Sequence, residues 1–565
     1  MKKGFIVLLA ILIPIVTFAG DKGIDQKIDE AFKPFSDLVS SIIFFPVFGA
    51  PFVLILLVVS ALFFTIYFGF PNFRYFGKAI NVVRGKYDHV DQSSAGDSNL
   101  AIDGDIKDTI ADESKDGEVT HFQALATAVS GTVGNGNIAG VALAIALGGP
   151  GATFWMIVCG LLGMSSKFVE CTLGVQYRDI GKDGTVYGGP MYYLSKGLKE
   201  KGFATLGKIT AVLFAIFCIG GSFGGGNAAQ SNQAVIVLKD LLGYESTSAG
   251  AIIGIVLALV IGVIIIGGIK RIASVTEKVV PFMAVMYLVA CLYIILTNFT
   301  LIDDAFSLIF TEAFNPRAIG VGGMIGVLLV GFKRAAFSNE AGAGSASIAH
   351  SAVKTKYSAS EGMVALLEPF IDTVVICTMT ALVIIIFNFG GESGSQKFQY
   401  GNVEVQEEFQ GVELDKKIYQ VQENTIIINN DTILKENGTY ASVNRIDRDT
   451  VFLTATSYAR IDGVNYKKEG DEYIIGGEKH KSFKGKVMID GKLYEGAGIT
   501  TQAFARYIPF SKWFLTIAVV LFAVSTMISW SYYGLQSWKF LFGRGKAADM
   551  TYKLLFLLFV IIGAA

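Results

Sequence analysis

The sequence predicts an all-α polytopic membrane protein that carries one small inserted β domain. First, 52% of the 565 residues are hydrophobic and only 17% are charged, with a mean hydropathy of +0.52. A soluble chain of this length would cover its surface with more charge. Second, apolar stretches long enough to cross a bilayer follow one another along the chain. Third, a long polar segment late in the chain has the Thr, Val, Ile and Tyr content of β-strands.

Composition excludes several classes of protein. The 47 Lys and Arg residues balance 48 Asp and Glu residues, so we expect no basic field and no nucleic-acid partner. The five cysteines lie in apolar stretches without paired spacing, which predicts neither disulfides nor a metal cluster. No nucleophile–base pair or phosphate loop is recognisable, so we expect no enzyme. The 64 glycines favour a transporter or channel, because glycine permits irregular backbone around a cavity.

The N-terminal region has three expected parts. Residues 1–19 join two lysines, a short apolar run and small residues, which predicts a signal peptide, with a further membrane helix as the alternative. Residues 20–86 then form an extracytoplasmic segment and the first membrane helix. Residues 87–118 are polar and acidic and predict a cytoplasmic loop.

Ten apolar stretches are the predicted spans. They run near residues 52–70, 121–147, 152–175, 206–226, 249–269, 275–297, 319–349, 360–389, 513–533 and from 552 onward. Lys and Arg gather in every second loop, which the positive-inside rule places in the cytoplasm. Residues 119–389 and 501–565 are therefore two parts of one membrane core. Residues 390–500 are expected to be the β domain, inserted on the extracytoplasmic side.

Two predicted spans contain poor helix formers at membrane depth. In the first, Asn135 and Asn137 alternate with Gly131, Gly134, Gly136 and Gly140. Lipid cannot satisfy an unwound backbone, so a break there must line a cavity; a continuous helix with a small-residue packing face is the alternative. A second stretch, residues 331–344, repeats the pattern and contains Lys333, Arg334 and Glu340; we expect its exposed main chain near residues 331–340. Paired interruptions in corresponding halves predict a binding site between inverted repeats.

Nine blocks in this order resemble the alanine/glycine:cation symporter family of bacteria and archaea. They are residues 117–128, 131–140, 148–156, 170–178, 188–193, 227–232, 332–344, 372–373 and 525–534. The resemblance covers nearly all of the membrane part and none of residues 390–499. It implies the leucine-transporter fold, an inverted five-helix repeat, in the bacterial cytoplasmic (inner) membrane. The last apolar run stops at Ala565, so we expect a C-terminally incomplete repeat, completed by a second polypeptide, or a truncated product.

The candidate site residues come from two sources. From the residues themselves, an unwound helix offers N–H groups to a carboxylate at Gly134, Asn135 and Gly136, and Asn137 suits the ion or the substrate. The resemblance implies a sodium site with carbonyls of Ser130 and Val133 and hydroxyls of Ser525 and Thr526. It also implies substrate contacts from Gln230, Phe332 and Met527. From the residues alone, the two hydroxyls could equally bond the preceding helical turn, and Phe332 and Met527 could be core residues.

The predicted function is symport of a small neutral amino acid, alanine or glycine, with Na⁺ as the coupling ion, by alternating access in a lipid membrane. Two alternatives stay open. A proton-coupled amino-acid transporter would use Glu170, Glu340 or Asp372 as its acid. A non-transporting sensor or receptor would use the inserted β domain.

Overall fold

The computed structural model describes residues 24–47, 49–87, 117–181, 183–244, 247–314, 323–389 and 492–564, with short strands between 402 and 489. The predicted signal peptide and most of the predicted loop 87–118 lie outside these residues. The chain divides into two units at Val59 and Ser60, and each unit is described by itself.

The first unit contains one helix that the sequence did not predict. Helix α2 (Ile24–Ile43) precedes a short hairpin of β1 (Pro46–Val47) and β2 (Ala50–Pro51), which pair antiparallel. The apolar helix α3 (Phe52–Tyr67) starts in this unit and continues into the next one. It occupies most of the predicted first span.

The second unit is built from helices. Their bounds are α4 (Pro71–Arg74), α5 (Phe76–Val83), α7 (His121–Thr132), η3 (Gly136–Gly140), α8 (Val141–Gly148), α9 (Gly151–Gln176), α10 (Pro190–Glu200), α11 (Ala204–Phe223), η4 (Gly224–Ala228), α12 (Ala229–Leu242), α13 (Thr247–Ile265), α14 (Gly268–Thr297), η5 (Phe299–Leu301), α15 (Ile302–Phe314), α16 (Gly323–Asn339), α17 (Ala346–His350), α18 (Ser358–Ala365), α19 (Leu367–Pro369), η7 (Phe370–Cys377), α20 (Thr378–Phe389), α21 (Ala497–Ala505), α22 (Ser511–Phe542) and α23 (Lys546–Ala564).

Six of the described helical segments are long and apolar enough to cross a membrane, and the bent pair formed by α7 and η3–α8 adds a seventh. Helices α3 and α13 are apolar but shorter. This pattern confirms a multi-pass membrane protein. One predicted boundary is wrong: the stretch 249–269 contains the end of α13 and the start of α14, because the chain turns at Gly267 and Gly268, where Gly268 has φ +67°.

The described strands are short. A small pair follows α9, namely β3 (Asp179–Ile180) and β4 (Val186–Tyr187). The others are β5 (Asn402–Val403), β6 (Val412–Leu414), β7 (Lys417–Tyr419), β8 (Val421–Gln422), β9 (Thr425–Ile426), β10 (Val443–Asp447), β11 (Thr450–Leu453), β12 (Tyr466–Glu469), β13 (Glu472–Ile475), β14 (Glu478–His480), β15 (Phe483–Lys484), β16 (Lys486–Ile489) and β17 (Lys492–Glu495). All their pairings are antiparallel, and β15 pairs with the distant β5. That they form a single extracytoplasmic domain stays a prediction.

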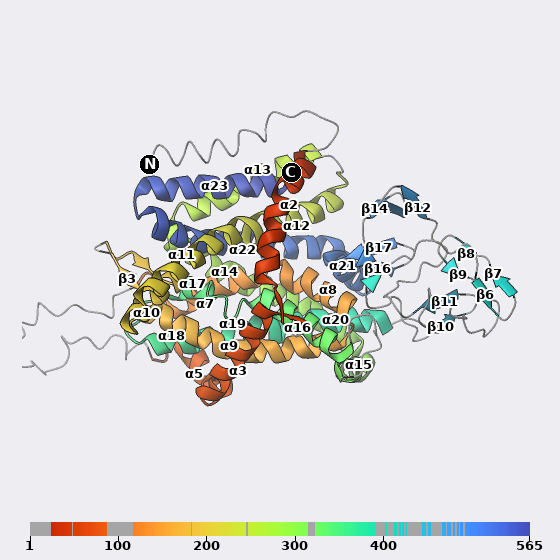
Figure 1. The fold of residues 1–565 in the computed structure, drawn as a ribbon, viewed down its shortest axis with the longest axis horizontal. Coiled ribbons are helices and arrows are strands. Elements are labelled where there is room, and N and C mark those ends of the chain that lie inside the picture. Colours follow the sequence, from red (N-terminus) through yellow and green to blue (C-terminus); the bar gives the residue numbers. More distant parts are fainter. Residues whose placement is uncertain are drawn as a thin grey trace, which may run out of the picture. The chain divides into compact units, whose positions relative to one another are not determined.

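Two long helices organise the packing of the second unit (Figure 1). Helix α22 packs against α7, α11, α12, α14 and α23. Helix α9 packs against α15, α16, α17 and α18. The side chains that α22 presents to its neighbours are buried, among them Phe522 and Tyr533. The interrupted spans α7–α8 and α16–α17 therefore pack against the long helices α22 and α9, whose contacts support their irregular backbone.

Candidate functional site

The first predicted interruption is confirmed between α7 and η3. A capping box starts α7: Thr120 Oγ1 accepts the Gln123 N–H at 3.2 Å, and Gln123 Oε1 accepts the Thr120 N–H at 3.1 Å. The helix ends at Thr132, helical structure resumes at Gly136, and the axes of the two halves differ by 52°. The span is therefore broken where glycine and asparagine alternate.

Hydrogen bonds of Gly134 and Asn137 maintain this break. The Gly134 N–H donates to Asn137 Oδ1 at 2.9 Å instead of to the Ser130 carbonyl, its partner in a regular helix. The Asn137 N–H donates to the Gly134 carbonyl at 3.1 Å instead of to the Val133 carbonyl. The carbonyls of Ser130 and Val133, the two predicted sodium ligands from the main chain, thus lose their regular donors.

The side-chain amide of Asn137 is fully buried and bonded. Its Nδ2 atom lies 2.6 Å from Asp372 Oδ1 and 3.2 Å from Ser338 Oγ, and donates to acceptors on η7 and α16. Asn137 thus joins the first broken span to two other helices. Its predicted contact with ion or substrate stays a prediction.

The second interruption lies further along the chain than predicted. Residues 331–339 are helical, and α16 ends at Asn339; α17 starts only at Ala346. The backbone adopts positive φ at Glu340 (+53°), Gly342 (+85°) and Gly344 (+87°). Glycine adopts such angles without strain, whereas Lys333 and Arg334 are good helix formers, so the break falls on 340–345.

A third interruption was not predicted as one. Helix α11 passes through the π-helical segment η4 before α12, within a single apolar span from Ala204 to Leu242. A Cβ on Gly226 would lie 2.3 Å from Trp530 Cγ, so only glycine permits the close approach of this segment to α22. The five glycines at 220, 221 and 224–226 are the signal that would have located it.

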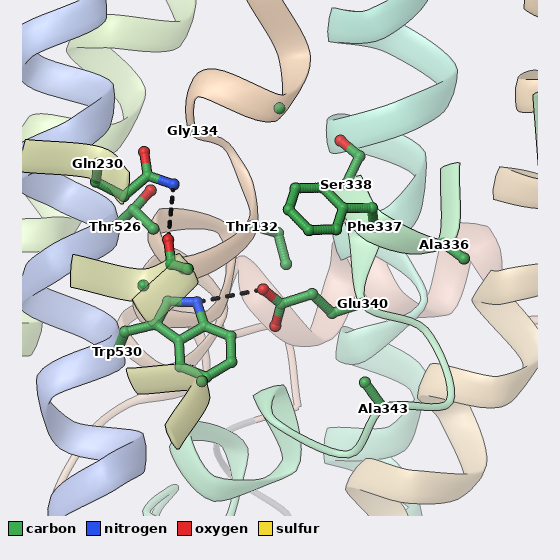
Figure 2. A pocket seen from close by; sticks show the side chains of 15 residues that line it. Thr132, Gly134, Gln230, Ala336, Phe337, Ser338, Glu340, Ala343, Thr526 and Trp530 are labelled. Atoms are coloured by element: carbon green, nitrogen blue, oxygen red, sulfur yellow. Dashed lines mark hydrogen bonds between the residues drawn. The ribbon is translucent and has the colours of Figure 1, made fainter. Parts of the chain in front are cut away.

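The first two interruptions and η4 line one cavity of about 290 Å³ (Figure 2). Four predicted site residues are in its lining: Gly134, Gly136, Gln230 and Thr526. Sequence reasoning did not assign Phe337 or Trp530 to the site, although both line the cavity. Phe332 and Met527 are buried and do not line it; the ring centroid of Phe332 lies 5.9 Å from that of Trp155.

Polar atoms without partners are found at this site. Asn135 Nδ2 donates to Gln230 Oε1 at 3.1 Å. Gln230 Nε2 donates in turn to the Gly225 carbonyl at 3.1 Å (Figure 2). Asn135 Oδ1 and Thr526 Oγ1 are buried without a hydrogen-bond partner in the described part of the chain. Buried polar groups are normally satisfied, so both atoms are available to a ligand.

Glu340 closes one side of the cavity. Trp530 Nε1 donates to Glu340 Oε1 at 3.2 Å, and the Ser345 hydroxyl donates to Oε2 of the same carboxylate (Figure 2 shows the first bond). Glu340 is the acidic residue in the cavity lining. The two donors fix its carboxylate at the start of the second break.

The remaining predicted sodium ligands are at the contact of α7 with α22. Ser130 Oγ donates to the Ser525 carbonyl at 2.7 Å, which holds the two helices together. The Ser525 hydroxyl donates to the Phe522 carbonyl at 3.0 Å, so it bonds the preceding turn. The Thr526 hydroxyl makes no such bond. The two adjacent hydroxyl residues therefore differ in availability.

Comparison with known proteins identifies the family. A model of the Sodium:alanine symporter family matches residues 35–418 and 483–565. The chain belongs to the sodium:alanine symporter family. The unmatched residues 419–482 lie inside the predicted insert, but the match enters both ends of that insert, which the resemblance was expected to leave out. Family membership confirms a membrane transporter, a symporter, and not an enzyme.

Curated relatives of the family share the core sequence. The "Sodium/alanine symporter AgcS" of Methanococcus maripaludis is 41% identical over 337 residues, which are 60% of this chain and 68% of that protein. The "Uncharacterized transporter YflA" of Bacillus subtilis is 41% identical over 275 residues, 48% of this chain and 56% of that protein. The "Putative sodium/proton-dependent alanine carrier protein YrbD" of Bacillus subtilis is 40% identical over 287 residues, 50% of this chain and 57% of that protein.

Proposed function

We propose that the protein carries a small neutral amino acid, alanine or glycine, together with Na⁺ across the cytoplasmic membrane by alternating access. The observation that carries this proposal is the cavity of about 290 Å³ at the unwound segment 133–135, with the unpartnered Asn135 Oδ1 and Thr526 Oγ1. The name of the relative AgcS, a sodium/alanine symporter, supports the same substrate and ion.

The substrate carboxylate binds at the start of the second half of the first broken span. The helical segment from Gly136 to Gly148 has its N-terminal end at the break, and Gly136 lines the cavity. The N-terminal end of a helix presents free N–H groups and a positive dipole end, which favour an anion. Asn135 and Gly136 supply these groups, whereas the Gly134 N–H donates to Asn137 Oδ1, and no positively charged side chain is required.

The substrate amino group faces the opposite wall. Glu340 offers a carboxylate there, held in place by Trp530 and the Ser345 hydroxyl. Gln230, which lines the cavity beside Gly134, supplies a further polar contact. A zwitterion thus finds opposite charges at the two broken spans, and this arrangement favours amino acids over simple carboxylates or amines.

The side chain of the substrate has little room. The cavity lies at the lower end of the range for small-molecule sites, which is roughly 300–1,000 Å³. Phe337 and Trp530 add bulky aromatic groups to its lining. A methyl group or a hydrogen fits such a space best, which supports alanine or glycine. Phe332 and Met527, which were predicted to contact the substrate, do not line the cavity and form no part of this wall.

The coupling ion binds between α7 and α22. The carbonyls of Ser130 and Val133 have lost their regular helical donors, and Thr526 Oγ1 has no hydrogen-bond partner among the described residues. The hydroxyl oxygen of Ser525 supplies a fourth ligand next to Thr526, since it donates its proton to the Phe522 carbonyl and keeps its lone pairs for the ion. Oxygen atoms of carbonyls and hydroxyls are the ligands that a hard cation prefers. A cation here requires α7 and α22 to be close together, so its binding favours one conformation of the transporter.

The leucine-transporter fold is part of the proposal. The break of α7–α8 and the break of α16–α17 lie in the second and seventh predicted spans, so each begins a set of five. Both breaks meet at the same cavity, as expected for inverted repeats that move around a shared site. The basic loops support a cytoplasmic orientation of alternate loops and an extracytoplasmic insert.

Reconstitution of the purified chain into liposomes tests the proposal. An inward Na⁺ gradient of tenfold plus 100 mV, negative inside, supplies about 3.7 kcal/mol per ion, enough to concentrate alanine roughly 500-fold. We expect radiolabelled alanine to accumulate with Na⁺ outside and not with K⁺. Accumulation that ignores Na⁺ and collapses with a protonophore would instead show proton coupling, and no uptake at all would refute transport by this chain.

A further inference from the structure

Six ionisable side chains form a second buried feature outside the cavity. They come from α7, α9, α17, α18 and α19 and are defined here as the ion-pair network: His121, Lys167, Glu170, His350, Glu361 and Glu368. All six are buried, and sequence reasoning did not group them. Burial of so many ionisable side chains is costly, which favours a functional role for them.

The network consists of two hydrogen-bonded halves. The His121 Nδ1 atom contacts Glu361 Oε2, and Glu361 Oε1 lies 2.5 Å from His350 Nδ1. Glu368 Oε1 lies 3.1 Å from Lys167 Nζ, which lies 3.4 Å from Glu170 Oε1. One gap separates these halves: His350 Nε2 and Glu368 Oε2 are 3.8 Å apart, and neither has a hydrogen-bond partner among the described residues.

The two ends of the network differ from its middle in exposure. The side chains of His121 and Glu170 are 9% and 7% exposed, whereas those of the other four members are 0% exposed. His121 begins α7 at the end that the positive-inside rule places in the cytoplasm. Glu170 Oε2 accepts the Gly344 N–H at 3.1 Å, within the 340–345 break beside the cavity. The network thus connects the cytoplasmic side to the second break, beside the cavity.

Its charge balance requires bound protons. Three carboxylates face one lysine, so the network has a charge of −2 when both histidines are neutral and is neutral when it holds two more protons. A buried net charge is strongly unfavourable. The other titratable groups nearby do not supply positive charge: they are Cys171, Tyr193, Glu340, Asp372 and Tyr533. Histidine is the side chain that most readily exchanges a proton near neutral pH.

We propose that the ion-pair network is a proton-binding site, that it exchanges protons with the cytoplasmic side through His121, and that its proton occupancy is linked to the occupancy of the cavity. This inference rests on the proposed function, because the linkage runs through the amino-acid site. His350 is on α17, directly after the break that carries Glu340 and Gly344. A shift of the break around a substrate therefore changes the gap between His350 and Glu368.

Linkage is reciprocal, and this makes the inference measurable. If the substrate-filled and substrate-free states hold different numbers of protons, then alanine binding releases or takes up protons. The apparent affinity for alanine then changes with pH by the same coupling. A network with a purely structural role would affect expression and thermal stability without any proton exchange on binding.

The test counts protons per bound alanine in purified protein. Weakly buffered protein with a pH indicator receives alanine in Na⁺ medium at several values between about pH 6 and 8, and radioligand binding gives the alanine bound. We expect a non-zero proton change for the wild type, smaller by at least about threefold in His350→Gln and in His121→Gln. The matched control Asp549→Asn, in an ion pair with Lys539 and Lys553 outside the network, keeps the wild-type value.

Two results would overturn the inference. One is a wild type that binds alanine without any proton change across this pH range. The other is an unchanged proton count in both histidine variants. Because the ratio is measured only on protein that binds alanine, a variant that fails to fold does not affect it, and His121 at the edge provides a second variant. Na⁺-driven uptake at fixed pH tests the proposed function separately, so intact uptake without proton exchange refutes only this inference.

Discussion

The Oδ1 atom of Asn137 accepts the main-chain N–H of Gly134 at 2.9 Å, and this bond takes the place of the helical bond from Gly134 to Ser130. A side chain thus satisfies the donor that an unwound span would otherwise leave free in the membrane. The same amide donates to Asp372 on η7, so the break is anchored to a neighbouring helix. The irregular backbone at residues 133–135 is therefore a stabilised part of the fold.

Replacing this amide should strongly reduce transport. In Asn137→Ala the Gly134 N–H and the Asp372 carboxylate lose a buried partner, at a cost of about 1–3 kcal/mol each. We expect alanine uptake to fall by at least tenfold at a similar expression level, about 1.4 kcal/mol or more. Uptake in proteoliposomes, normalised to incorporated protein, measures this effect. Near-normal uptake would show that the bond is dispensable.

Glycine at position 134 should be required for its small size. A Cβ there would lie 2.7 Å from Thr526 Oγ1, whereas the nearest atom to a Cβ on Gly136 is 3.8 Å away. We expect Gly134→Ala to lose about tenfold or more in Na⁺-driven uptake, and the matched variant Gly136→Ala to stay within about threefold of wild type. Equal effects in the two variants would contradict this explanation.

The Thr526 hydroxyl should serve the ion. Thr526→Val keeps the shape of the side chain but removes the one unpartnered oxygen on α22 at this contact. We expect the Na⁺ concentration for half-maximal uptake to rise about tenfold or more, while Thr526→Ser stays close to wild type. Titration of uptake with Na⁺ at constant ionic strength measures both. An unaltered Na⁺ dependence in the valine variant would remove Thr526 from the ion site.

The indole N–H of Trp530 should matter for the orientation of Glu340. Trp530→Phe retains an aromatic ring beside Gly226 but cannot donate to Glu340 Oε1. We expect alanine affinity to weaken by about threefold to tenfold. A hydrogen bond to a charged group contributes about 1.5–3 kcal/mol, and the loss is reduced because the Ser345 hydroxyl still holds the other oxygen of the Glu340 carboxylate. Equilibrium binding of alanine provides the measurement. Unchanged affinity would mean that Glu340 does not depend on Trp530.

A salt-bridge cluster outside the membrane should make a small pH-dependent contribution to stability. Partial burial alone would raise the pKa of Asp179, but hydrogen bonds from Lys196 and Arg544 outweigh burial and hold that pKa below its ordinary value. A lowered folded-state pKa means stability that is present above the unfolded pKa and is lost as pH falls through the folded one. Asp179→Asn should therefore cost less than about 1 kcal/mol at neutral pH, since the side chain is one-third exposed.

Thermal unfolding of wild type and Asp179→Asn, at neutral pH and at about pH 3, below the unfolded pKa of aspartate, checks this prediction. The difference in melting temperature should shrink at the lower pH. A difference that grows on acidification would mean that Asp179 stabilises the fold by another route.

Local composition predicted the first break but not the position of the second. Glycine and asparagine around residue 134 are poor helix formers on both sides of the break, so the interruption could be located from the sequence. The charged residues around residue 334 suggested that the second break lies there, yet they are helical. The turn depends instead on Gly342 and Gly344. Helix propensity determined the position of the second break, and the energetic cost of charged side chains in the membrane did not.

Side-chain directions and long-range contacts could not be predicted from the sequence. Phe332 was predicted for the site, but Phe337 lines the cavity; five residues along a helix point to different faces. The ion-pair network joins residues from 121 to 368, and no spacing in the sequence brings them together. The third break at η4 could have been predicted from the sequence, because five glycines mark it.

Alanine binding to the purified wild-type protein, measured as Na⁺ is replaced by K⁺ at constant ionic strength and pH, tests most directly whether amino acid and ion share the site at residues 133–135. We expect Na⁺ to strengthen alanine binding by at least about tenfold, alanine to strengthen Na⁺ binding by the same factor, and both effects to vanish in Gly134→Ala. Alanine binding of equal strength in Na⁺ and K⁺ would contradict the shared site.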